Sequence, residues 1–153
     1  MAHKSRRARI VLASGVFDLL HLEHVRFLEE AKKAGGKNAQ LLVIVARDST
    51  VRGIKGRKPV IPENQRLALV ESLKVVDEAL LGLEDFDIGE VIQTIRPDVI
   101  ALGYDQEHMA KKVREYIQRK GLTVKVVQVG KFGQDELDSS SKIRQKIVEN
   151  FSR

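Results

Sequence analysis

Two histidines three positions apart, His21 and His24, are the residues of this chain best suited to chemistry. They follow an apolar stretch (10–13) and a Ser-Gly turn, and a helix is expected to begin near Leu22. Side chains at this spacing on a helix project from nearly the same face. The first N–H groups of a helix have no partner within it and, with the positive end of the dipole, attract anions. Imidazole donors beside such a helix start predict a phosphate-binding centre.

The same two histidines could instead hold a metal ion. No third ligand lies near them in the sequence, because His3 is in the N-terminal tail and His108 falls in a later predicted helix. Phosphate contact is therefore the favoured hypothesis, and no residue is assigned as a metal ligand. Asp18, just before the pair, could orient an imidazole or occupy a turn, and the sequence leaves both readings open.

A second polar cluster lies in the basic segment 47–66, which has Lys55 near its centre. Cations on a loop above the edge of a sheet suit a polyphosphate, because arginine forks and lysine point charges neutralise its negative charge. Lys55 is predicted to contact the ligand, whereas Arg52 and Lys58 are expected to be ordinary solvated cations. Arg66, on the helix that follows, is expected to reach back toward the site.

Two more polar clusters come later in the chain. Asp105 follows a glycine at the end of a predicted strand, where a carboxylate could accept from a ribose hydroxyl or a base amine, or cap the next helix. Residues 139–141 are serines before a helix, with Arg144 close behind. Hydroxyls, free N–H groups and a cation at this helix start predict a second anion site, although simple serine capping gives the same pattern.

Strand-like and helix-like segments alternate along the chain and form the scaffold for these clusters. The predicted strands are 10–13, 41–46, 75–81, 99–102 and 124–129. The predicted helices are 22 to the Gly35-Gly36 stop, 62–73, 88–95, 109–120 and a last one with Ile143, Ile147 and Phe151 as its apolar stripe; 47–60 is a polar, basic connection. This alternation implies an α/β fold: a doubly wound, parallel five-stranded sheet in a single domain.

Ligands of doubly wound sheets bind beyond the carboxyl ends of the strands. Residues 15–24, 47–48 and 103–105 each follow the end of a predicted strand. The polar clusters are therefore expected to converge on one rim of the sheet.

Composition narrows the class of protein. The chain of 153 residues is 42% apolar and 31% charged, which is ordinary for one globular domain. It has no cysteine, no signal-peptide pattern and no apolar stretch of membrane-spanning length, so we expect a cytoplasmic protein without membrane association. Four of the charges that make up the net +6 sit at positions 4, 6, 7 and 9 in an N-terminal arm expected to be solvated, so no nucleic-acid partner is predicted.

These clusters resemble the cytidylyltransferase-type nucleotidyltransferase superfamily, whose marks are an H-x-G-H sequence and a late S-[ST]-[ST]-x-[IL]-R sequence. The corresponding segments here are 21–24 and 139–144. Within the superfamily, the chain is similar to the small archaeal FAD synthases (FMN adenylyltransferases) over about residues 9–150. That similarity is carried by residues 15–21, 45–48, 55–59 with 62–63, 80–82 and 97–106.

The resemblance implies a Rossmann-like nucleotidyltransferase domain at 9–153 behind a basic arm at 1–8. It implies an enzyme that transfers AMP from ATP to FMN, giving FAD and pyrophosphate, with a divalent cation (Mg, Mn or Co), commonly as a homodimer. His21, His24 and Lys55 would then be catalytic. The residues that it places against ATP are Val16, Phe17, His21, Leu22, Glu23, His24, Asp105, Ser140, Ser141 and Arg144.

The chain departs from the family pattern in ways that keep alternatives open. Glu23 stands where the usual glycine separates the histidines, and residues 134–138 lack the lead-in found in glycerol-phosphate enzymes. One alternative is a CTP-dependent cytidylyltransferase acting on glycerol 3-phosphate or a similar phosphorylated alcohol. A second is a non-catalytic nucleotide-binding regulatory module, which Glu23 favours. A fragment of a class I aminoacyl-tRNA synthetase shares the histidine pair, but the chain is short for it.

Overall fold

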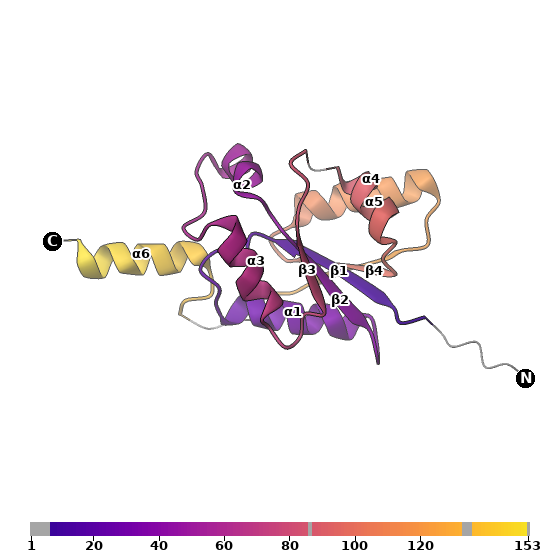
Figure 1. Cartoon of the computed structure of the whole chain (residues 1–153), viewed down its shortest axis with the longest axis horizontal. Helices are drawn as coiled ribbons and strands as arrows, with labels where there is room; N and C mark the ends of the chain where they lie inside the picture. Colours follow the sequence, from indigo (N-terminus) through magenta and orange to yellow (C-terminus); the bar gives the residue numbers. More distant parts are fainter. Residues whose placement is uncertain (1–6, 86, 133–135, 153) are drawn as a thin grey trace, which may run out of the picture.

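A parallel sheet of five strands organises the chain (Figure 1). The structure, a computed structural model, describes residues 7–85, 87–132 and 136–152. The strands are β1 (Ile10–Gly15), β2 (Gln40–Val45), β3 (Glu78–Leu81), β4 (Val99–Gly103) and β5 (Lys125–Val129). The helices are α1 (Leu22–Ala34), α2 (Asp48–Lys55), α3 (Glu63–Glu71), α4 (Ile88–Ile95), α5 (Glu107–Lys120) and α6 (Ser140–Phe151). The expected doubly wound α/β fold is confirmed.

Alternating residues of the strands build a core on each face of the sheet. Val11 of β1 points into a cluster with Leu28 of α1 and residues of α3. The next residue, Leu12, points into the opposite cluster with Ile92 of α4 and residues of α5. Figure 1 shows α1 on one side of the sheet and α4 with α5 on the other. Both faces are covered, which explains the continuous apolar runs of β2 and β4.

The strand order β3-β2-β1-β4-β5 places a switch point between β1 and β4. The chain moves outward from β1 through β2 to β3, and then returns to pair β4 with the other side of β1. A crevice opens at the carboxyl ends of the strands where the order reverses. Gly15 ends β1 and Gly103 ends β4, so the polar segments after these two glycines meet at this crevice.

Two expectations about local structure are wrong. The polar connection at 47–60 contains helix α2, whose Val51 is buried and which ends at Gly56 in the left-handed conformation (φ 71°). Only one residue of this short helix is buried and most of its residues are polar, so the segment resembles a solvated connection in the sequence. The third strand is shorter than 75–81, because only Glu78–Leu81 pairs with β2.

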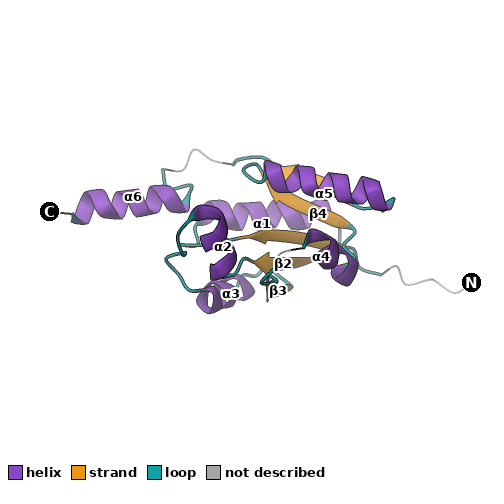
Figure 2. Ribbon diagram, turned by 90° about the horizontal axis from the view of Figure 1, so that it is seen from above, coloured by secondary structure: helices purple, strands orange, loops and turns teal. Residues whose placement is uncertain are grey.

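Helix α6 projects from the body of the molecule in both views (Figures 1 and 2). Ser139 caps it as predicted, its hydroxyl accepting from the Lys142 N–H at 3.2 Å. The apolar stripe expected to pack is exposed instead: Ile147 is 50% and Phe151 80% accessible, and no residue of α6 is buried. Periodicity alone predicted an apolar face, but burial also requires a neighbouring element.

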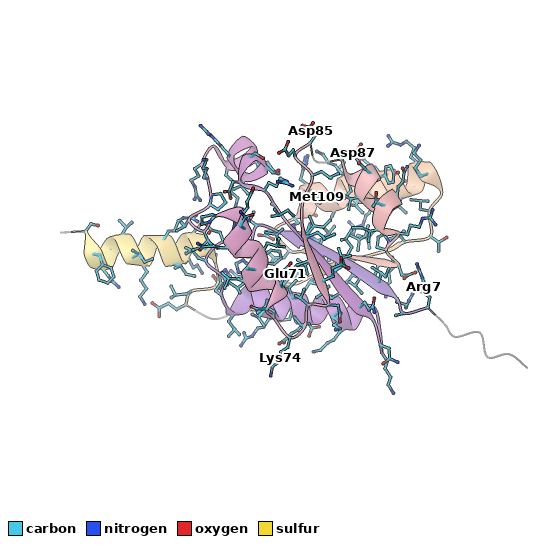
Figure 3. The ribbon with its side chains drawn as sticks, in the orientation of Figure 1. Arg7, Glu71, Lys74, Asp85, Asp87 and Met109 are labelled. Atoms are coloured by element: carbon cyan, nitrogen blue, oxygen red, sulfur yellow. The ribbon has the colours of Figure 1, made fainter. Side chains whose placement is uncertain are left out.

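Arg7 of the N-terminal arm is 63% exposed and also contacts the body of the domain. The Arg7 guanidinium donates to both carboxylate oxygens of Asp98, each at 3.3 Å, beside the start of the sheet (Figure 3). Lys4 and Arg6 lie outside the described residues. None of the helices in the described ranges is long and apolar enough to cross a membrane.

Candidate active site

The turn between β1 and α1 brings the histidines to the crevice. Phe17 and Leu19 adopt positive φ angles (56° and 49°), which reverses the chain sharply after Gly15. A Cβ at Gly15 would lie 3.0 Å from the Phe17 ring, so glycine is needed for that ring to pack there. Phe17 is only 3% exposed and its ring lies 5.4 Å from that of His24. The ring is therefore part of the core.

His21 and His24 lie against each other at the start of α1. Their ring centroids are 3.8 Å apart and their planes differ by 25°. The His21 backbone N–H, at the N-cap, donates to Nδ1 of His24 at 3.2 Å. A nitrogen that accepts a hydrogen bond carries no proton, so neutral His24 holds its proton on Nε2. His24 is thereby fixed as an Nε2–H donor.

Burial lowers the pKa of both imidazoles. The pKa of His24 falls to about 3, first through desolvation and then through the neighbouring His21 and Lys55, with Asp18 opposing. Desolvation also lowers the pKa of His21, with Glu23 and Asp138 acting in the opposite direction. Without a ligand, the pair is therefore neutral near neutral pH and offers hydrogen-bond donors rather than cations.

Asp18 joins three segments around the histidines. Its carboxylate accepts from the backbone N–H groups of Val60 and Ile61, both at 2.8 Å. Its Oδ2 lies 3.8 Å from Arg144 of α6, and its backbone carbonyl accepts from the Ser140 hydroxyl. Asp18 is thus a turn residue with a positioning role, and it brings the start of α6 to the start of α1. This connection places the early and the late motif side by side.

Arg66 does not reach into the site as expected. It is fully buried, at 0% exposure, and donates to the backbone carbonyls of Val16, Ala46 and Ile61. A fourth contact, at 2.7 Å, reaches Asp48. Four of its five N–H donors are used by the protein, so Arg66 supports the segments that follow β1 and β2.

The other residues predicted for the site differ in exposure and in their contacts. Lys55 is the exposed last residue of α2 and acts electrostatically on His24. Leu22, the first residue of α1, is 51% exposed. The Ser141 hydroxyl accepts from Arg144 at 2.9 Å, which holds that guanidinium at the start of α6. Val16 is half-buried and its carbonyl accepts from Arg66.

Asp105 is exposed after β4, but it does not cap α5. The cap position is Gln106, whose side chain accepts from the Gly103 N–H at 2.8 Å and donates to the Ser14 carbonyl at 3.1 Å. Gln106 therefore ties the end of β4 to the end of β1. Sequence reasoning missed it, because both of its partners are backbone groups that carry no sequence signal.

A charged cluster on the other side of His21 was also missed. The Asp138 carboxylate is buried and pairs with Lys142 at 2.7 Å and Lys131 at 3.0 Å. These two ammonium groups lower the pKa of Asp138 to about 2. Close by, Glu23 is buried and one of its oxygens accepts from the Phe132 N–H at 2.8 Å. The Glu23 contact holds the chain after β5 against the start of α1, and the Asp138 pairs join Lys131, after β5, to Lys142 of α6.

A divalent cation has no ready-made protein cage here. Within the described ranges, no group of three or more His, Asp or Glu side chains is arranged to hold a metal ion. Magnesium in phosphate-transfer sites is commonly bound by substrate oxygens with one or two carboxylates. The site therefore fits a cation that arrives with a polyphosphate.

A family model and individual relatives place the chain in the same group of proteins. Residues 12–146 match the family described as cytidylyltransferase-like. The chain is 49% identical over 144 residues to the FAD synthase of Methanothermobacter marburgensis, covering 94% of this chain and 88% of that protein. It is 47% identical over 144 residues to the FAD synthase of Methanopyrus kandleri, covering 94% of each.

Solved structures agree on the fold. A protein described as a lipopolysaccharide core biosynthesis protein from Thermoplasma volcanium GSS1 is 46% identical, with a TM-score of 0.73 over 82% of this chain and 98% of that one. The pantoate-beta-alanine ligase of Francisella tularensis is 12% identical, with a TM-score of 0.65 over 92% of this chain and 66% of that one. This second likeness shows the fold alone.

Proposed function

The chain belongs to the cytidylyltransferase-like family, and from this we propose that it is a nucleotidyltransferase that moves AMP from ATP to FMN. The products are FAD and pyrophosphate. The names of relatives nearly half identical to the chain support the choice of substrates. The observation that carries the chemistry is the stacked His21–His24 pair at a helix start, joined through Asp18 to the start of α6.

The reaction needs no covalent intermediate with the protein. An oxygen of the FMN phosphate forms a bond to the α-phosphorus of ATP, while the bond from that phosphorus to the bridging oxygen breaks and pyrophosphate leaves with the electron pair. Negative charge grows on oxygens that face the imidazoles. The Nε2–H of His24, the ring of His21 and the dipole of α1 stabilise that charge where it develops.

Other residues hold the nucleotide around this centre. Lys55 and Arg144 neutralise the phosphates from opposite sides, and Ser140 and Ser141 contribute the free N–H groups of the α6 start. Val16, Phe17, Leu22 and Glu23 lie at or just before the start of α1, where the nucleotide is placed. Asp105, exposed after β4, accepts a hydrogen bond from the adenosine end of ATP.

A divalent cation (Mg, Mn or Co) accompanies ATP and shields the phosphate charge. We also propose a homodimer, because α6 carries exposed Ile147, Val148 and Phe151 away from its own domain. Sedimentation equilibrium tests this: a dimer that Phe151→Asp dissociates is expected. A wild-type monomer would contradict it.

The substrates are tested by measuring pyrophosphate release with ATP or CTP against FMN or glycerol 3-phosphate. We expect release only with ATP and FMN, with FAD formed in equal amount. Release with CTP and glycerol 3-phosphate would identify a cytidylyltransferase instead. Tight ATP binding without release for any acceptor would identify a regulatory module.

A further inference from the structure

The Gln106 side chain lies between the ends of two strands at the switch point of the sheet. The pairing of β1 with β4 ends at Ala13 and Ala101. Beyond this pair, the Gln106 carboxamide joins the strands: its Oε1 accepts from the Gly103 N–H at 2.8 Å, and its Nε2 donates to the Ser14 carbonyl at 3.1 Å. A carboxamide inserted in this way spans a wider gap than a direct bond from an N–H to a carbonyl. It therefore holds the crevice between β1 and β4 open at a fixed width.

The backbone of Gln106 closes the turn that follows β4. Its N–H donates to the Gly103 carbonyl at 3.1 Å, so residues 103–106 form a β-turn with Tyr104 and Asp105 at the central positions. Both central residues are exposed, whereas Gly103 is buried and Gln106 half-buried. Gln106 thus bonds both backbone groups of Gly103 and fixes the base of a turn whose tip is open to a ligand.

The Asp105 carboxylate lies over the base of the same turn. A Cβ at Gly103 would lie 2.9 Å from Asp105 Oδ1 and 3.6 Å from Gln106 Oε1. The carboxylate occupies this space because glycine leaves it empty. Its position therefore depends on where Gln106 holds Gly103.

We propose that Gln106 is a positioning residue for the adenosine end of ATP: it sets the distance between the ends of β1 and β4 and the orientation of the turn that carries Asp105. This rests on the proposed function, in which Asp105 accepts a hydrogen bond from that end of the nucleotide. The phosphates are held by other elements, the starts of α1 and α6. Loss of the Gln106 contacts should therefore weaken the binding of adenosine and leave the binding of phosphate intact.

Gln106→Met keeps a side chain of similar length and removes both carboxamide hydrogen bonds. In the whole protein with Mg²⁺, we expect KM and the dissociation constant for ATP to rise by about tenfold, while kcat changes by less than about twofold. Inorganic tripolyphosphate, which has no adenosine end, should bind wild type and variant with affinities that agree within about twofold. Gln118→Met, at an exposed position of α5, is the matched control and should behave as wild type.

These measurements separate a positioning role from a general disturbance of the site. A wild-type KM for ATP in Gln106→Met would overturn the proposal. An equal loss of affinity for tripolyphosphate, or a fall in kcat with KM unchanged, would also overturn it. ATP binding without FAD formation in wild type would contradict the proposed function, while the two affinities still tested Gln106. Failure of the wild type to bind ATP would overturn both.

Hydrogen exchange in wild type supplies a second measurement that needs no variant. Because the carboxamide bonds are present without a ligand, the Gly103 N–H and the Gln106 side-chain amide should be protected from exchange both without and with ATP. Rapid exchange of either group without ATP would show that the crevice is not set in advance, and would overturn the role of Gln106.

Discussion

The Arg66 guanidinium lies 2.7 Å from the Asp48 carboxylate, at a point where the Arg66 side chain is wholly shielded from solvent. The same guanidinium donates to the carbonyls of Val16 and Ala46, which follow β1 and β2. One side chain thus fixes the ends of two neighbouring strands, and the turn that presents His21 begins directly above it. The active site depends on a buried cation that does not itself contact substrate.

Replacing Arg66 should therefore weaken the fold. Arg66→Met removes the buried donor to three backbone carbonyls and to Oδ1 of the half-buried Asp48. We expect a loss of about 3–5 kcal/mol in the free energy of unfolding. Urea denaturation measures this. Arg52→Met, at an exposed position, should stay within about 0.5 kcal/mol of wild type. A loss below about 1 kcal/mol in Arg66→Met would contradict the role assigned to the network.

The burial of Arg66 could not be predicted from the sequence. The sequence predicted a strand at 41–46 and a helix at 88–95, and β2 and α4 match them within a residue, because patterns of apolar residues are local signals. The partners of Arg66 are carbonyls, which every residue type carries, so no pattern marked it as buried. The exposed stripe of α6 shows a second limit: an apolar pattern predicts an apolar helix face, but not which element covers that face.

For the candidate site, too, the sequence predicted the residues but not the contacts between them. Its members could be named from residue type and spacing, and the sheet topology predicted that they converge. The contacts that bring them together run through Asp18 and Gln106 to backbone groups distant in sequence. Such contacts depend on the finished fold, so their roles emerged only from the structure.

Asp18 is expected to hold the basic segment in place. In Asp18→Asn, one of the acceptors for the Val60 and Ile61 N–H groups becomes a donor, and the attraction to Arg144 is lost. The segment before Val60 should then open more often. Limited trypsin digestion measures this as faster cleavage after Lys55 and Arg57. An unchanged cleavage rate would show that other contacts hold the segment.

Lys55 should matter for turnover but not for stability. Lys55→Met removes a cation that acts on His24, and we expect kcat/KM for ATP to fall by about 10–100-fold. Because the side chain is exposed, the unfolding free energy should change by less than about 0.5 kcal/mol. Lys58→Met, three positions away and equally exposed, is the matched control. Equal losses of kcat/KM in both variants would show that the overall positive charge of the segment matters, rather than a specific contact of Lys55.

The low pKa of His24 makes stability depend on pH. Its pKa is about 3 in the folded chain against 6.5 as the ordinary value, so between these limits the unfolded chain binds more protons. The unfolding free energy contributed by this residue therefore falls as pH is lowered through that window, by at most about 1.4 kcal/mol per unit. Urea denaturation at several pH values should give a steeper slope for wild type than for His24→Ala. Parallel slopes would refute the neutral, buried state.

Turnover and ATP affinity in His24→Ala together test the central claim most directly, because this variant removes a donor aimed at charge that develops during the reaction. We expect FAD formation from ATP and FMN to slow by about 100–1,000-fold, while the dissociation constant for ATP changes by less than about tenfold. A rate equal to that of wild type would contradict the account.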